Sequence, residues 1–295
     1  MDMFNLELIK KEYPFAQHSF GIDSLSMNYI DEGSGEPVVM LHGNPTWSFY
    51  YRNLVAPLRT GRRIVVPDHI GCGLSSKPQS YNYSLANHVD NLTRLINHLS
   101  LKNITLVLHD WGGAIGMGYA VKHPENIKRI VVFNTAAFLS PNIPPSINFC
   151  RTPILGELVT RGLNGFLGSG VHFGFGMENS ERFTPEVKEG YLAPYRSWHD
   201  RIAIARFVQD IPMSMEHPTY QLLLSIEERL GLLKEKPMQI IWGMKDFCFT
   251  EKFLERWINY FPTAEVHRME DAGHWVVEDS IEKIIPLIEG FLKRD

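Results

Sequence analysis

Five short, almost uninterrupted runs of apolar residues constrain the fold of this 295-residue chain more than any other feature. Each run stops at glycine, proline or a polar residue, and continuous apolar character is typical of strands buried on both faces of a parallel sheet. Stretches with helical periodicity separate the runs. This alternation predicts an α/β fold with a mostly parallel, doubly wound sheet. The predicted strands are 37–41, 63–67, 104–108, 130–133 and 238–242, and the predicted helices are 84–99, 113–122, 253–260 and 281–292.

The segment 136–220 interrupts the alternation. It is rich in proline, glycine and aromatic residues and shows no clear strand pattern. Because structureless loops of this length are uncommon in compact domains, we expect a helical cap inserted at 136–220. The α/β core is then formed by 1–135 and 221–295. Ligands of doubly wound sheets bind beyond the carboxyl ends of the strands, so the residues after each run are the candidate site residues.

Composition excludes several classes of function. Lys and Arg number 29 and Asp and Glu 33, so a net charge of −4 gives no reason to expect nucleic-acid binding. The longest apolar stretch, 104–121, is interrupted by His109 and Asp110, and the first 15 residues carry several charges. We therefore expect no membrane span and no secretory signal there. The 3 cysteines are far apart, which suggests neither a disulfide framework nor a zinc site and fits a cytoplasmic protein.

Residues 106–113 read Leu-Val-Leu-His-Asp-Trp-Gly-Gly, an apolar strand that leads directly into a polar residue, two glycines and a helix. This segment is similar to the nucleophile elbow of α/β-hydrolases, although Leu108 stands where the general pattern has glycine. Asp110 occupies the nucleophile position, and a carboxylate is already ionised at neutral pH. Its attack on an sp³ carbon gives a stable ester, which favours displacement of halide or opening of an epoxide or lactone. The alternative role for Asp110 is that of a helix N-cap.

A candidate acid and base follow in the chain order that such hydrolases use. Asp246 comes just after the strand at 238–242, and His274 lies near the C-terminus. We predict that His274 activates water as a general base and that Asp246 orients it and stabilises its positive charge. No carboxylate occurs between residues 129 and 157, so the strand at 130–133 is followed by no rival acid. We expect His42, His109 and His267 to be structural or supporting residues.

The loop 42–47 follows the first buried run. In α/β-hydrolases this loop and the residue after the nucleophile supply the backbone N–H groups of the oxyanion hole. Here these residues are Asn44 and Trp111, whose side chains also carry N–H donors. We predict that both face one apolar cavity and hold a leaving anion. A turn residue and a packing aromatic are the alternative roles for Asn44 and Trp111.

With these motifs the chain resembles the haloalkane dehalogenase family over nearly its full length. The resemblance implies an α/β-hydrolase core with a helical cap, and hydrolysis of haloalkanes to alcohol and halide through a covalent alkyl-enzyme ester. It implies Asp110 as nucleophile, His274 as base and Asp246 as acid. It also implies Asn44 and Trp111 as halide-stabilising residues, a set that looks like the third subgroup of the family. The matching stretches are 42–47, 68–71 with Gly73, 77–78, 109–113, 191–195 and 271–274.

Other reactions stay open on the same scaffold. Sequences of this subgroup resemble β-lactone decarboxylases, which form an olefin and carbon dioxide. Epoxide hydrolases have a similar elbow but an aromatic residue where Asn44 stands, and they use two cap tyrosines, for which Tyr191, Tyr195 and Tyr220 are available. A non-catalytic small-molecule receptor is a further alternative.

We expect a small apolar substrate, halogenated or a lactone, with water and halide as the other partners. This chemistry requires no cofactor and no metal, and the sequence does not predict the oligomeric state. Substrate size is expected to depend on the cap around Phe138, Phe149, Phe166, Phe173 and Phe207.

Overall fold

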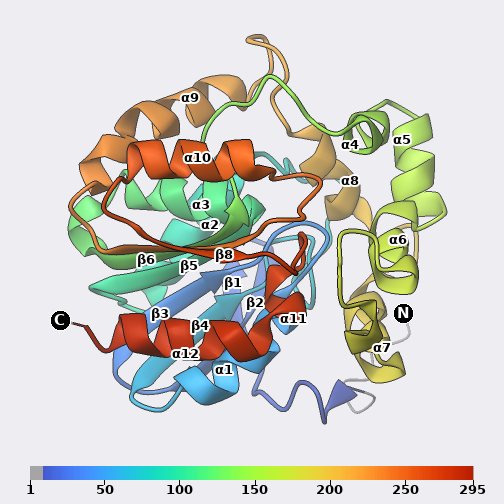
Figure 1. The fold of residues 1–295 in the computed structure, drawn as a ribbon. Coiled ribbons are helices and arrows are strands. Elements are labelled where there is room, and N and C mark those ends of the chain that lie inside the picture. The colour runs from blue at the N-terminus through green and yellow to red at the C-terminus, as the bar shows by residue number, and fades with distance from the viewer. Residues whose placement is uncertain (1–8, 295) are drawn as a thin grey trace.

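The computed structural model describes residues 9–294, so part of the N-terminal stretch for which we expect no secretory signal lies outside the described residues. Its strands form one sheet in the order β1-β2-β4-β3-β5-β6-β7-β8 (Figure 1). The pairs β1–β2 and β2–β4 are antiparallel and the other pairs are parallel, which confirms the mostly parallel sheet. The strands are β1 His18–Ile22, β2 Leu25–Gly33, β3 Glu36–Leu41, β4 Arg62–Pro67, β5 Ile104–Asp110, β6 Ile127–Thr135, β7 Met238–Gly243 and β8 Glu265–Met269.

The five predicted strands correspond to β3 to β7. Helices cover both faces of this central part, with α2, α3 and α10 on one side and α1 and α12 on the other (Figure 1). Leu106 and Leu108 of β5 pack with the first group of helices, whereas Val107 between them packs with the second. Burial on both faces therefore explains why these strands are continuously apolar. The helices are α1 Arg52–Leu58, α2 Leu85–His98, α3 Trp111–Ala120, α10 Glu251–Tyr260 and α12 Ile281–Leu292.

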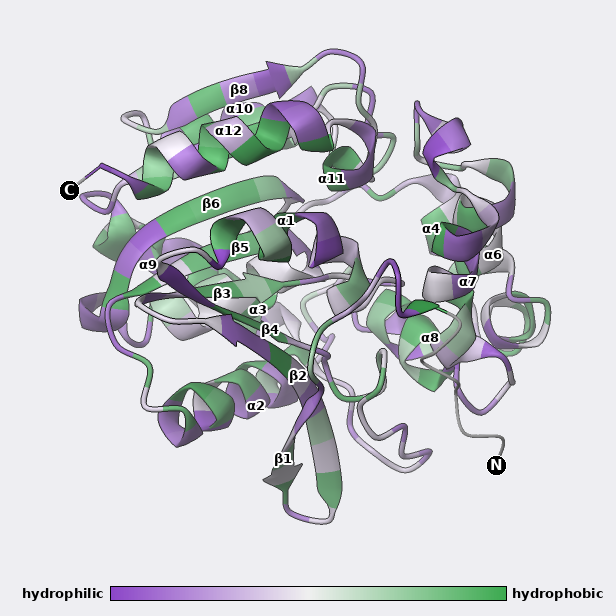
Figure 2. Ribbon diagram, turned by 90° about the horizontal axis from the view of Figure 1, so that it is seen from below, coloured by the Kyte–Doolittle hydropathy of each residue, from purple (hydrophilic) through white to green (hydrophobic). Residues whose placement is uncertain are grey.

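The covering helices are amphipathic. Figure 2 shows hydrophobic and hydrophilic residues alternating along α12, as expected for a helix that buries one side only. Helix α2 begins after Ser84, whose hydroxyl oxygen accepts a hydrogen bond from the backbone N–H of Asn87. Within residues 9–294 we find no helix that is both long and apolar enough to cross a membrane.

Helices and irregular segments, without a strand, connect β6 to β7 in the described chain. Figure 1 places α4 to α8 together at one end of the molecule, beside the carboxyl ends of the parallel strands, whereas α9 contacts α3 on the face of the sheet. This arrangement supports our division into a core (1–135 and 221–295) and a cap (136–220), which we retain as a proposal. The helices are α4 Pro145–Cys150, α5 Leu155–Glu157, η4 Leu158–Gly162, α6 Gly165–Phe173, η5 Ser180–Arg182, α7 Pro185–Leu192, η6 Ala193–Tyr195, α8 Ile202–Gln209, α9 Tyr220–Arg229 and η7 Leu230–Leu233.

Helix α3 approaches β3 so closely that only glycine fits at position 112. A Cβ atom on Gly112 would lie 2.0 Å from the carbonyl oxygen of Leu41, which is a rigid backbone atom. This contact fixes where α3 starts, and therefore where the residue before it, Asp110 at the end of β5, presents its side chain.

Replacing Gly112 by alanine should lower the free energy of unfolding by about 3 kcal/mol or more, because neither the helix nor the strand can move aside. Urea unfolding curves measure this loss. Gly290→Ala is the matched control, since a Cβ there meets no atom within 4 Å and lies in helix α12. That variant should be more stable than the parent by about 0.5–1 kcal/mol. Equal effects of the two substitutions would contradict the close-approach argument.

Candidate active site

Asp110 lies at a sharp junction between β5 and α3. Its backbone has φ +49° and ψ −125°, a conformation that few residues with a side chain adopt. The hydroxyl of Thr135 on the neighbouring strand donates a hydrogen bond to the Asp110 carbonyl oxygen and so holds the turn in place. Asp110 makes no side-chain N-cap hydrogen bond to α3, so its alternative role as a helix cap is not observed. The residue is only 9% exposed.

Two backbone N–H groups face the Asp110 carboxylate. The N–H of Asn44 donates to Oδ1 at 2.6 Å, and the backbone N–H of Trp111, the next residue in the chain, favours the charged form of the carboxylate and so lowers its pKa. The loop reaches this position because residue 43 is glycine: a Cβ on Gly43 would lie 2.1 Å from Oδ1 of Asp110. The structure therefore brings the backbone N–H groups of Asn44 and Trp111 to Asp110, and their role as an oxyanion hole stays a prediction.

Burial raises the pKa of Asp110 above its ordinary value, because the apolar surroundings disfavour the charged form. The positive charge of His274 and the N–H groups of Asn44 and Trp111 act in the opposite direction. These groups favour an ionised carboxylate in apolar surroundings.

His274 and Asp246 form the pair that the sequence predicts. Nδ1 of His274 lies 2.9 Å from Oδ2 of Asp246, and both residues are buried or nearly so. The other oxygen, Oδ1, accepts hydrogen bonds from the backbone N–H groups of Cys248 at 2.6 Å and Phe249 at 3.1 Å. The carboxylate is thus fixed in orientation, and it directs the His274 ring.

The pKa of His274 is raised above its ordinary value. Burial alone would lower the pKa, but the charge of Asp246, its hydrogen bond to Nδ1 and the charge of Asp110 together outweigh burial. Asp110 and Asp246 therefore both stabilise the positive imidazolium form.

Two residues hold the backbone of the loop that carries His274. Nε2 of His109 lies 2.9 Å from the carbonyl oxygen of His274, and because burial and the charge of His274 lower the pKa of His109, its ring is neutral and donates this bond. Oδ2 of Asp279 accepts a hydrogen bond from the N–H of Gly273 at 2.8 Å. The supporting role predicted for His109 agrees with this geometry, whereas the sequence reasoning did not include Asp279.

Asn134, at the end of β6, was also missed as a supporting residue. Its side chain accepts a hydrogen bond from the N–H of Gly243 at 2.7 Å and donates one to the carbonyl oxygen of the same residue at 2.9 Å. It therefore fixes the end of β7, three residues before Asp246.

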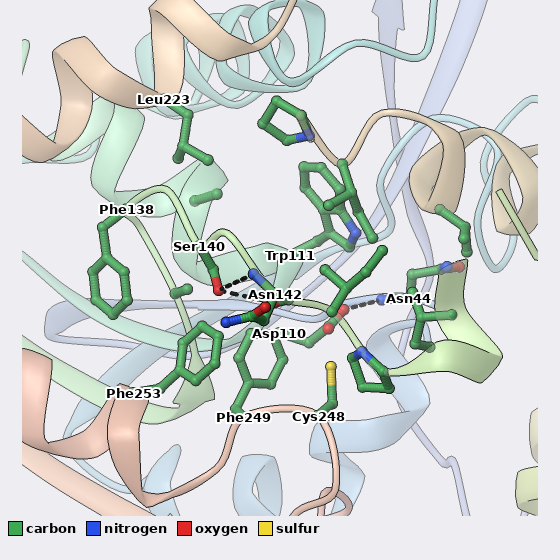
Figure 3. Close-up of a pocket in the computed structure, with 18 of the residues that line it drawn as sticks. Asn44, Asp110, Trp111, Phe138, Ser140, Asn142, Leu223, Cys248, Phe249 and Phe253 are labelled. Carbon is green, nitrogen blue, oxygen red and sulfur yellow. Dashed lines mark hydrogen bonds between the residues drawn. The ribbon is translucent and has the colours of Figure 1, made fainter. Parts of the chain in front are cut away.

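Two apolar lobes meet at Asp110. The first, which we name the Trp111 lobe, has a volume of about 130 Å³, and Figure 3 shows Asn44, Trp111 and Cys248 around Asp110 in it. The second, the His274 lobe, has a volume of about 120 Å³ and extends toward α6. Both lobes are lined by Asn44, Asp110, Ile147, Phe166 and Cys248.

The predicted anion donors face this cavity. The indole N–H of Trp111 makes no hydrogen bond within the described residues, and its ring packs against Phe207 at a centroid distance of 5.3 Å. The side-chain amide of Asn44 donates to the carbonyl oxygen of Ile204 at 3.1 Å, which leaves its second N–H available. An anion in the Trp111 lobe can therefore be bound by two neutral donors.

The cap phenylalanines have three different positions. Phe138 and Phe166 line the Trp111 lobe, as expected for residues that limit substrate size. Phe207 lies behind Trp111 and lines neither lobe. Phe149 and Phe173 are 47% and 86% exposed and line neither lobe.

The cap tyrosines do not line the cavity. The hydroxyl of Tyr191 donates to Glu278, and that of Tyr195 accepts a hydrogen bond from the N–H of Gly73 at 3.0 Å. Neither residue, nor Tyr220, lines a lobe of the described cavity. The geometry offers no tyrosine to activate an epoxide.

Comparison with known proteins shows which family the chain is similar to. Residues 36–155 match the model of the alpha/beta hydrolase fold family. A cis-3-alkyl-4-alkyloxetan-2-one decarboxylase of Shewanella oneidensis is 45% identical, with 95% of this chain and 89% of that protein aligned. Haloalkane dehalogenase 2 of Mycobacterium tuberculosis is 30% identical over 94% of both chains. The crystal structure of haloalkane dehalogenase DatA from Agrobacterium tumefaciens superimposes with a TM-score of 0.84 at 26% identity, over 95% of this chain and 96% of that one.

The chain belongs to the haloalkane dehalogenase family. It is thus an enzyme of the α/β-hydrolase type, and this member of the family combines an Asp, a His–Asp pair and two neutral donors around one apolar cavity.

Asp246→Asn should lower the pKa of His274 relative to the parent enzyme, because it removes the charge that raises that pKa. An NMR titration of the imidazole measures the shift. Asp271→Asn is the matched control, since Asp271 is an exposed carboxylate in the same loop as His274. If Asp271→Asn lowered the pKa as much as Asp246→Asn, the hydrogen-bonded pair would not be the cause.

Proposed function

We propose that this family member decarboxylates β-lactones that carry an alkyl chain on each of two neighbouring ring carbons, forming an alkene and carbon dioxide. The observation that carries the proposal is the meeting of two apolar lobes at Asp110. A substituted oxetan-2-one can place its ring at the carboxylate and one chain in each lobe, whereas a simple haloalkane fills one lobe only. The printed name of the Shewanella oneidensis relative supports the same substrate class.

In the first step Asp110 acts as the nucleophile. A carboxylate oxygen attacks ring carbon C4 in line with the C4–O bond, that bond breaks, and an ester forms between Asp110 and C4. The carboxylate that leaves remains attached to C3, and the free N–H groups of the Asn44 amide and the Trp111 indole stabilise its charge. The ester carbonyl oxygen keeps the backbone N–H groups of Asn44 and Trp111 as donors.

In the second step the bond between C3 and the carboxylate carbon breaks and carbon dioxide leaves. The released electron pair forms the C3=C4 double bond, and the ester C4–O bond breaks to regenerate the Asp110 carboxylate. Inversion at C4 followed by anti elimination leaves the two chains on the same side, so a cis lactone gives a cis alkene. The two steps together consume no water, proton or cofactor.

His274 has an electrostatic role in this reaction. Its positive form, favoured by Asp246, lowers the pKa of Asp110 and keeps the nucleophile ionised in an apolar cavity. It does not act as a base, because no proton is removed in either step.

Haloalkane hydrolysis is the second candidate, and one specific observation favours it. With Nδ1 of His274 bound to Asp246, the other ring nitrogen, Nε2, makes no hydrogen bond within the described chain and is available to a water molecule. The neutral ring would activate that water to hydrolyse an ester on Asp110, after Asn44 and Trp111 have bound the halide. The epoxide and receptor alternatives have no comparable support, since Tyr191 and Tyr195 are engaged elsewhere, Tyr220 lines neither lobe, and the Asp110, Asp246 and His274 set is complete.

Side-by-side turnover of a cis-dialkyl β-lactone, 1,2-dibromoethane and styrene oxide tests the proposal. We expect the lactone to give alkene and carbon dioxide, and to have the highest kcat/KM of the three substrates. Gas chromatography measures the organic products, and a halide assay measures turnover of 1,2-dibromoethane. Asp110→Asn should reduce lactone turnover by at least about 10³-fold, because the amide is not a nucleophile. Halide release without alkene formation would overturn the lactone proposal in favour of dehalogenation.

The variant His274→Phe distinguishes lactone decarboxylation from haloalkane hydrolysis. Lactone turnover should persist within about 100-fold of the parent, since general-base catalysis is not part of it. With 1,2-dibromoethane the same variant should accumulate an ester, seen as an added mass on the Asp110 peptide, because the first step needs no base.

The two reactions should also differ in their pH dependence. Ester hydrolysis should accelerate as the pH rises through the His274 pKa, since only the neutral ring accepts a proton, whereas alkene formation should not accelerate. An alkene-forming rate that follows the ester-hydrolysis profile would contradict the electrostatic role of His274.

A further inference from the structure

We propose that the His274 lobe is a subsite that limits the length of one alkyl chain of the substrate, whereas the Trp111 lobe leaves the length of the other chain unrestricted. This inference rests on the proposed function, since it assigns one chain of a disubstituted lactone to each lobe. It makes α6 in the cap the element that determines chain-length specificity.

The His274 lobe ends against packed structure. Helix α6 contributes Gly165, Ser169 and Gly170 to its wall. The helix lies directly on Trp275, because a Cβ on Gly170 would be 3.0 Å from the indole ring. The small residues thus create the space in this lobe, and the indole beneath them sets its depth.

A pair of rings closes the side of the His274 lobe that faces solvent. Phe175, just after α6, and Phe247, one residue after Asp246, pack together with ring centroids 4.5 Å apart and the ring planes tilted by 53°, and both line the lobe. Phe175 is 48% exposed, so its outer surface faces solvent while its inner surface covers the lobe. A chain that reaches this pair cannot extend further unless the rings separate.

The Trp111 lobe borders the surface more broadly. Ser140, Asn142 and Phe253 are among seven residues that line both this lobe and a larger surface depression of about 860 Å³, whereas the His274 lobe shares only Phe247 and Cys248 with that depression. Charged residues of α10, Lys252 and Glu255, lie along the depression. A chain in the Trp111 lobe can therefore continue outward to the surface of the protein.

The two lobes should respond differently to added methylene groups. Each methylene buried in apolar surroundings increases binding roughly fourfold, until the space is full and overpacking reverses the gain. The chain in the His274 lobe should therefore show a sharp optimum of length. For the chain in the Trp111 lobe, kcat/KM should rise and then stay level.

The test uses cis lactones in which either the C3 chain or the C4 chain is lengthened while the other is held short. In the parent enzyme, one of the two series should show an optimum and the other a plateau in kcat/KM. Ser169→Leu fills the His274 lobe and should shift the optimum to shorter chains, with a loss of at least tenfold for the parent's preferred chain. Phe175→Ala opens the end of the lobe and should shift the optimum to longer chains.

His172→Leu is the matched control, since His172 lies on α6 but is exposed and lines neither lobe. It should leave both series unchanged. If Ser169→Leu and Phe175→Ala also left both series unchanged while lactone turnover persisted, the length-limiting subsite would be refuted and the proposed function retained.

Binding of the same lactones to the Asp110→Asn protein, measured by calorimetry, gives a readout that needs no turnover. In that background Ser169→Leu should weaken binding of the longer chains in one series only, by at least tenfold. Equal effects on both series would overturn the inference. This result would hold whether the enzyme acts on lactones or on haloalkanes, because the measurement needs no turnover.

Discussion

A carboxylate held in an apolar cavity is the interaction on which the rest of this structure depends. The desolvation of Asp110 is opposed by two backbone N–H groups and by the charge of His274, and each of these donors belongs to a different segment of the chain. The loop with Asn44 can approach only because residue 43 is glycine, and α3 can begin at Trp111 only because residue 112 is glycine. The geometry of the core around β3, β5 and α3 is therefore the condition for a reactive anion at this position.

In the proposed reaction, the reacting groups and the groups that contact the substrate chains come from different parts of the fold. Asp110 ends β5, and Asp246 and His274 follow β7 and β8, whereas α4 and α6 of the connecting segment between β6 and β7 form much of the lobe walls. The same reacting groups support both lactone opening and halide displacement, because both begin with attack of a carboxylate on an sp³ carbon. What distinguishes the two candidate reactions is therefore the shape of the cavity and the need for a neutral His274.

The sequence predicted the parts of the fold that are buried on both sides. Strands β3 to β7 are continuously apolar and were found for that reason. The edge strands β1 and β8 were missed because their positions leave polar residues such as His18 and Glu265 partly or fully exposed. Strand β2 was missed because polar residues interrupt its apolar run. The five candidate site residues could be named because parallel strands collect their following residues at one edge. Asn134 and Asp279 could not be named, since their hydrogen-bond partners are backbone atoms that are distant in sequence or lie in another element. The two lobes could not be predicted either, because they depend on how α4 and α6 pack over the strand ends.

Asp279 has a consequence for how such enzymes could be recombined. Its carboxylate accepts hydrogen bonds from Gly273, next to His274, and also from the backbone N–H groups of Glu178 and Asn179, between α6 and α7. The core and the connecting segment therefore share one buried acceptor. A chimera that carries the segment between β6 and β7 from another family member would need to supply those two N–H groups in the same place. Without them, the exchange would leave a buried carboxylate underbonded beside the histidine, and the transplanted segment would disturb the chemistry as well as the choice of substrate.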